Sequence, residues 1–120
     1  MKQLSFALLM ALMGTSVAYG AAIKNKDLFE ACQDKGPAGQ NFCYGYIVSA
    51  TNAAQYYRNL VDTQNVYLNV CFPPNVTNRM IVKTYVDWVT EYPSVLEGAA
   101  FVGVSTALSS KYSCPEKPPA

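Results

Sequence analysis

The stretch Asn41 to Tyr57, NFCYGYIVSATNAAQYY, decides the fold. Its apolar residues recur at intervals of three and four, the spacing of one face of an α-helix: Cys43, Tyr46, Ile47, Ala50, Ala54 and Tyr57. Polar residues take most of the other positions. The pattern therefore predicts an amphipathic helix of about five turns. The sequence KGPAG at residues 35–39 comes before it and predicts a break.

Two more helices are predicted, one before and one after this stretch. Residues 25–34 form a short segment in which Asp27 and Glu30 fit an N-terminal capping pattern. Thr77 is suited to cap a later helix, because its hydroxyl can accept a free backbone N–H. The apolar stripe of that helix consists of Ile81, Tyr85, Trp88, Val89 and Tyr92, and Pro93 ends it.

A last helix is predicted near the C-terminus. Ser94 and Glu97 have the spacing of a capping box, and the apolar stripe continues through Leu96, Ala100, Val104 and Leu108 to about Ser110. Residues 66–71 alternate loosely, but no other segment offers a strand partner, so we expect an extended loop there. The sequence thus predicts an all-α protein, a small four-helix bundle.

The N-terminus has the pattern of an export signal. Lys2 supplies a positive charge, Leu4 to Met13 is uncharged, and Ala18 and Gly20 are small residues before a cleavage site. We expect residues 1–20 to be a signal peptide and residues 21–120 to be a single, exported helical domain. The apolar run is shorter than the roughly 20 residues that span a bilayer. We therefore expect no membrane attachment after cleavage.

Export places the four cysteines in an oxidising compartment, where an even number of cysteines in a short chain favours disulfides. Three pairings are open. We expect Cys43 with Cys71, which would tie the start of the second helix to the entry of the third, and Cys32 with Cys114. A zinc site is disfavoured because the spacing contains no CxxC pair and the chain has no histidine. We expect no metal and no cofactor.

The composition argues against catalysis and against nucleic-acid binding. Without histidine, the chain cannot build a Ser-His-Asp or Cys-His centre. Nine basic residues against eight acidic ones give a net charge of +1, which excludes a strongly basic nucleic-acid binder. The nine tyrosines favour a protein interface, because tyrosine combines a large rigid surface with a polar tip. We expect Tyr46 and Tyr57 on the core stripe with their hydroxyls at its rim, and Tyr44, Tyr56 and Tyr67 at an interface.

Several motifs together resemble the Rap/Tai family of periplasmic immunity proteins. They are Cys32, FCYGYI at residues 42–47, CFPPNVT at residues 71–77, Tyr92-Pro93 and YSC at residues 112–114. The resemblance implies a small helical protein that protects a bacterium from peptidoglycan-cleaving amidase toxins delivered by type VI secretion. It implies that the protein binds the toxin and covers its active-site groove. It does not imply an enzyme.

Within this interpretation, we expect the toxin to contact the segment between the second and third helices. Its residues are Asp62, Gln64, Asn65, Tyr67 and Asn69, with Tyr67 as the anchor. A homodimer is left open. The alternative is a periplasmic holdase chaperone for acid stress, although a chain with no histidine and eight carboxylates has few groups for an acid-driven switch. A cell-wall enzyme is a third alternative.

Overall fold

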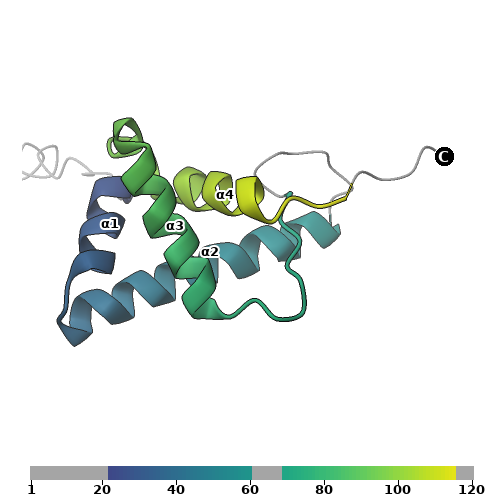
Figure 1. Cartoon of the computed structure of the whole chain (residues 1–120), viewed down its shortest axis with the longest axis horizontal. Helices are drawn as coiled ribbons and strands as arrows, with labels where there is room; N and C mark the ends of the chain where they lie inside the picture. Colours follow the sequence, from purple (N-terminus) through teal and green to yellow (C-terminus); the bar gives the residue numbers. More distant parts are fainter. Residues whose placement is uncertain (1–21, 61–68, 116–120) are drawn as a thin grey trace, which may run out of the picture.

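The structure, a computed structural model, describes residues 22–60 and 69–115 and contains four α-helices (Figure 1). These are α1 (Asn25–Gln33), α2 (Pro37–Leu60), α3 (Asn78–Glu91) and α4 (Ala100–Lys111), and a 3-10 turn, η3 (Pro93–Val95), lies before α4. In these ranges β-structure is limited to one isolated bridge between Lys24 and Ala99. The predicted all-α four-helix bundle with two disulfides is confirmed.

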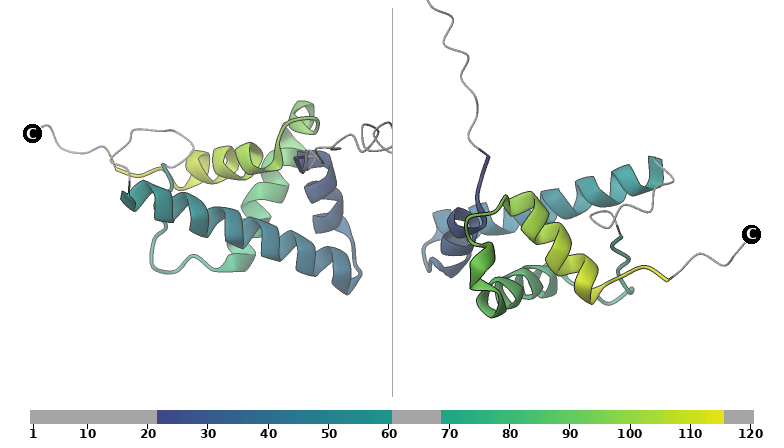
Figure 2. Two further views of the ribbon diagram at one scale, coloured as in Figure 1. Left: turned by 180° about the vertical axis from the view of Figure 1, so that it is seen from behind. Right: turned by 90° about the horizontal axis from the view of Figure 1, so that it is seen from above.

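The longest helix, α2, organises the other three. In Figures 1 and 2, α1 turns back from the N-terminal end of α2, α3 crosses α2, and α4 packs beside α3. All four helices contribute to one hydrophobic core, whose largest fully buried side chains are Tyr85, Leu28, Ile47, Leu108, Val89 and Val104. None of the helices in the described ranges is both long and apolar enough to cross a membrane.

The local signals set some helix starts but not all. Thr77 caps α3 as predicted, because its Oγ1 accepts the backbone N–H of Met80 at 3.3 Å. The carboxylate of Asp27 likewise accepts the N–H of Lys24 at 3.2 Å at the start of α1. The predicted break at 35–39 is shorter than expected, since α2 already begins at Pro37. Proline suits the first turn of a helix, where its missing N–H would have no helical partner.

The predicted start of the fourth helix is wrong. Residues 93–95 form a 3-10 turn, and α4 begins only at Ala100, with no side-chain cap. Tertiary contacts replace the expected capping box. The N–H of Ala100 donates to the carbonyl of Ile23 at 2.8 Å, and the carbonyl of Gly98 accepts the N–H of Asn25 at 2.8 Å. The backbone around the start of α1 and the backbone around the start of α4 therefore satisfy each other's hydrogen-bonding groups.

The predicted disulfide pairing is also wrong. The structure joins Cys32 to Cys43, with Cα atoms 5.0 Å apart, and Cys71 to Cys114, with Cα atoms 4.8 Å apart. Cys32 lies near the end of α1 and Cys43 in the second turn of α2, so the tight turn between the two helices brings them together. The start of α1, by contrast, lies beside the start of α4. The end of α1, which carries Cys32, therefore packs against α2 and not against the segment that carries Cys114.

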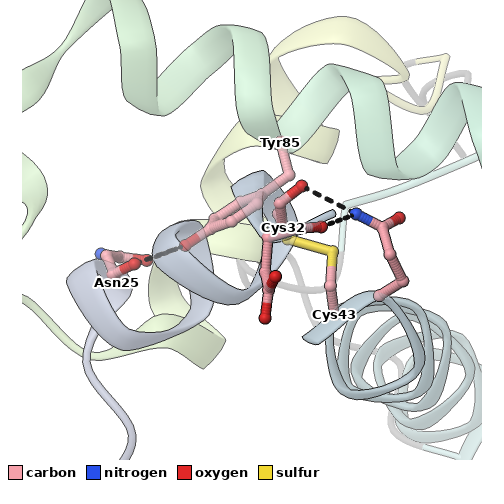
Figure 3. Close-up of a disulfide and its surroundings, with 6 residues drawn as sticks. Asn25, Cys32, Cys43 and Tyr85 are labelled. Atoms are coloured by element: carbon pink, nitrogen blue, oxygen red, sulfur yellow. Dashed lines mark hydrogen bonds between the residues drawn. A yellow bond between two sulfur atoms is a disulfide. The ribbon is translucent and has the colours of Figure 1, made fainter. Parts of the chain in front are cut away.

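A buried polar contact fixes α1 against α3 (Figure 3). The hydroxyl of Tyr85 donates to Oδ1 of Asn25 at 2.9 Å, and Nδ2 of Asn25 donates to the carbonyl of Val95 at 2.9 Å. Gly103 of α4 provides the space, since a Cβ at that position would overlap the Asn25 side chain. Burial raises the pKa of Tyr85 well above its ordinary value. Its hydroxyl is therefore held protonated as a donor.

Candidate partner-binding surface

The last two turns of α2 expose large apolar side chains. Tyr56, Tyr57 and Leu60 are 61%, 55% and 62% exposed, and the two tyrosine rings meet edge to face with centroids 5.8 Å apart. We call these three residues the α2 end patch. In Figures 1 and 2, this end of α2 extends past α3 and α4. An exposed apolar cluster of this kind is typical of a surface that a partner covers.

Helix length explains why the α2 end patch exists. With 24 residues, α2 is much longer than α3, with 14, and α4, with 12. At about 1.5 Å per residue, its final turns lie beyond the reach of the helices that cover it. Its buried positions therefore stop at Ala54. The apolar spacing of three and four continues to Tyr57, but neither α3 nor α4 covers that side chain.

The tyrosine predictions divide accordingly. Tyr46 is half-buried as expected; burial raises its pKa, and a hydrogen bond with the backbone of Phe101 partly offsets the increase. Tyr57 was expected in the core, and this prediction is wrong because the side chain is more than half exposed. Tyr56 is exposed, and Tyr44 is half-buried. Leu60 was not singled out from the sequence as an exposed apolar residue. The feature that could have identified it is its position at the end of a helix that is longer than its neighbours.

Most of the predicted toxin-contact residues lie outside the described residues. Asp62, Gln64, Asn65 and Tyr67 fall in residues 61–68. Asn69 is described, and it is half-buried, directly before Val70, which is 2% exposed and packs in the core. The α2 end patch leads directly into this predicted segment in the sequence.

A second surface feature lies where α1 meets α2. It is a shallow depression of about 600 Å³ lined by Asp27, Glu30, Ala31, Gln33, Asp34, Gly39 and Phe42. The Cys32–Cys43 disulfide braces the same corner (Figure 3). Gly39 allows the close approach of α2 to Asp34, because a Cβ there would overlap the aspartate side chain. The depression is acidic and has an exposed aromatic ring at its edge.

Surface ion pairs link the start of α1 to the turn before α4. Nζ of Lys24 lies 2.8 Å from one carboxylate oxygen of Glu97, and Nζ of Lys26 lies 3.5 Å from the other. The hydrogen bond and charge of Lys24, with a further contribution from Lys26, lower the pKa of Glu97. All three side chains are about half exposed or more, so these pairs contribute little to stability.

The described residues offer two surface features, the α2 end patch and the depression where α1 meets α2. They include no group of three or more cysteine, aspartate or glutamate side chains placed to hold a metal ion. All four cysteines of the chain are in disulfides, so no thiol is available as a nucleophile. What the described surface does offer is exposed aromatic and aliphatic area on a covalently braced helical scaffold.

Comparison with known proteins gives one match. The family of Rap1a immunity proteins matches residues 24–114, a range that includes all four helices and both disulfides. No curated protein and no solved structure matches the chain. The resemblance of the cysteine and proline motifs to the Rap/Tai immunity proteins is thereby confirmed. Because the match covers well over half of the sequence, the chain belongs to the family of Rap1a immunity proteins.

Proposed function

We propose that this protein acts in the periplasm, where it binds and inhibits a peptidoglycan amidase that a type VI secretion system delivers. Membership of the Rap1a family implies immunity to a type VI effector, and it carries the proposal. Two parts of the proposal go beyond family membership: that the target is an amidase, and that residues 1–20 export the protein. The match begins at residue 24, after the predicted signal peptide, which supports export.

Inhibition by occlusion suits a rigid surface without catalytic groups. Binding strength comes from a few anchors that are buried on association, and it increases when those anchors are ordered beforehand. Tyr56 and Tyr57 meet this requirement, because they lie on a helix and their rings pack against each other. Tyrosine loses little conformational freedom on binding and brings a large contact area.

We therefore propose that the toxin contacts the α2 end patch together with the segment that follows it. Asp62, Gln64, Asn65, Tyr67 and Asn69 remain the proposed contact residues of that segment. Leu60, at the junction, extends the apolar area of the patch towards them. One continuous stretch of chain, from Tyr56 to Asn69, would then supply both the helical anchors and the residues that enter the groove of the toxin.

Co-expression tests the function itself. The full chain is produced with candidate secreted amidases, and two quantities are measured: recovery of a complex by affinity purification, and peptidoglycan cleavage by the amidase. We expect a cognate amidase to co-purify and to lose its activity. Turnover of peptidoglycan by the purified immunity protein alone, or suppression of the aggregation of acid-stressed clients without any dedicated partner, would contradict the proposal.

Alanine variants test the contact surface. Replacing both Tyr56 and Tyr57 with alanine should weaken toxin binding by about 2 kcal/mol or more, roughly 30-fold or greater in Kd. Replacing Gln64 and Tyr67 should also weaken it. Met80→Ala is the matched control, because Met80 is a similarly exposed apolar residue in the first turn of α3. If the tyrosine variant binds as well as the control, the contact lies elsewhere while inhibition itself still stands.

A further inference from the structure

The two disulfides have different chemical surroundings. Cys71–Cys114 joins the segment before α3 to the residues that follow α4, and the N–H of Cys71 donates to the carbonyl of Tyr112 at 2.7 Å. Arg58, near the end of α2, donates from its Nη1 to Sγ of Cys71. Both cysteines are half-buried, and the neighbours of Cys114, Ser113 and Pro115, are exposed. One sulfur of this disulfide thus touches a cation, and the other lies in an accessible stretch of chain.

The other disulfide joins a half-buried cysteine, Cys32, to a fully buried one. Cys43 is 1% exposed and belongs to the hydrophobic core. The polar group that the structure places beside Cys32 is the uncharged amide of Gln40, which donates to the backbone carbonyl of Cys32 and not to its sulfur. One disulfide of the chain therefore has a cationic neighbour. The other has a sulfur, that of Cys43, which lies among apolar side chains and serves as an internal comparison.

We propose that Cys71–Cys114 is a thiol-exchange site for a dithiol reductant, with Cys114 as the attacked sulfur and Cys71 as the leaving group. A thiolate of the reductant forms a bond to Sγ of Cys114, the bond between Cys114 and Cys71 breaks, and its electron pair leaves on Sγ of Cys71 beside Arg58. The second thiolate of the reductant then attacks the sulfur that the reductant contributes to the mixed disulfide. This attack releases the Cys114 thiolate. The dithiol is oxidised to a disulfide, and both cysteine thiolates take a proton from water.

The leaving group decides which disulfide reacts. Thiol–disulfide exchange is faster when the departing thiolate is stabilised, and a neighbouring guanidinium stabilises it. Departure of Cys43 would instead place a negative charge among apolar side chains, which is strongly unfavourable. Attack at Cys114 also directs the charge towards Arg58, whereas attack at Cys71 would leave it on Cys114.

A second observation shows what the disulfide restrains. Tyr112, two residues before Cys114, is 8% exposed, and its buried hydroxyl has no hydrogen-bond partner among the described residues. Its ring packs edge to face against Phe72, with centroids 5.1 Å apart. A buried hydroxyl without a partner favours states in which water reaches it. Reduction of Cys71–Cys114 would remove the covalent restraint on both sides of this contact, so we expect the segments around Tyr112 and Phe72 to separate.

The test compares the two disulfides in the same folded protein. The purified oxidised full chain is incubated with dithiothreitol under native conditions, samples are quenched with an alkylating reagent, and peptide mapping follows each cysteine. We expect Cys71 and Cys114 to be alkylated at least tenfold faster than Cys32 and Cys43. With glutathione in place of the dithiol, which leaves the mixed disulfide in place, we expect the adduct on Cys114. Equal rates, faster opening of Cys32–Cys43, or an adduct mainly on Cys71 would overturn the proposal.

Arginine variants test the cation. Arg58→Gln should slow the opening of Cys71–Cys114 roughly threefold to tenfold, whereas Arg58→Lys, which keeps the charge, should slow it less. Arg79→Gln is the control for loss of one positive charge, because Arg79 is an exposed residue of α3. The opening rate of Cys32–Cys43 in each variant reports any general loosening of the fold. An Arg58→Gln variant that keeps the wild-type rate would contradict the assigned role of Arg58.

Discussion

Oδ1 of Asn25 accepts a hydrogen bond from the hydroxyl of Tyr85 in the interior of the bundle, at 2.9 Å. Asn25 is 2% exposed, although it is the first residue of α1. Its side-chain amide also donates a hydrogen bond to the carbonyl of Val95. This one residue therefore connects α1, α3 and the turn before α4.

Removing the Tyr85 hydroxyl should destabilise the protein. In Tyr85→Phe, Oδ1 of Asn25 loses its donor while it stays buried, so we expect a loss of about 1–3 kcal/mol in the free energy of unfolding. Urea denaturation followed by circular dichroism measures it. Tyr92→Phe is the matched control, because Tyr92 is exposed, and we expect a change within about 0.5 kcal/mol. Equal effects of the two substitutions would contradict the role given to the buried contact.

Two glycine substitutions should have opposite effects. A Cβ at Gly103 would overlap the Asn25 side chain, and we expect Gly103→Ala to cost about 1–3 kcal/mol. At Gly45, in the middle of α2, a Cβ meets no atom within 4 Å. There we expect Gly45→Ala to stabilise the protein by about 0.5–1 kcal/mol, because alanine is the better helix former. Thermal unfolding of the two variants compares them, and a shift of both in the same direction would refute the prediction.

Free-thiol counts after paired substitutions should report the disulfide connectivity. Replacing Cys71 and Cys114 with alanine removes one whole disulfide, so we expect no free thiol by reaction with Ellman's reagent. Replacing Cys32 and Cys114 removes half of each disulfide, and we expect two free thiols. The chain-entropy relation gives a cost of about 4 kcal/mol for losing Cys71–Cys114 and about 3 kcal/mol for losing Cys32–Cys43.

The ion pairs of Glu97 should give a small acid dependence of stability. Lys24 and Lys26 lower the pKa of Glu97 in the folded protein. The contribution of this carboxylate is therefore present above its unfolded pKa and is lost as the pH falls through its folded pKa. We expect wild type and Glu97→Gln to differ most near neutral pH and to converge as the pH drops below about 4. Unfolding curves at several pH values in low salt measure the difference, and a gap that widens in acid would contradict the assignment.

The sequence by itself determined that the chain folds into four helices and that its cysteines form disulfides. Apolar spacing around Ile47 and the cap at Thr77 are local signals, and α2 and α3 follow them, because a helix is set by residues within a turn or two of one another. An even number of cysteines after a predicted export signal favoured disulfides, and the structure pairs all four. Membership of the Rap1a family was also visible in the motifs.

Only the tertiary structure decided which cysteines pair, where α4 begins and which tyrosine is exposed. Each of these depends on the segment that a residue meets after the helices have packed. Cys32 meets Cys43 because α1 turns back on α2. Ser94 caps no helix, and the carbonyl of Ile23, just before α1, accepts the N–H of Ala100 at the start of α4. Tyr57 continues the apolar spacing of α2 beyond the end of its neighbours, so a periodic pattern that predicts a buried face instead leaves an exposed one.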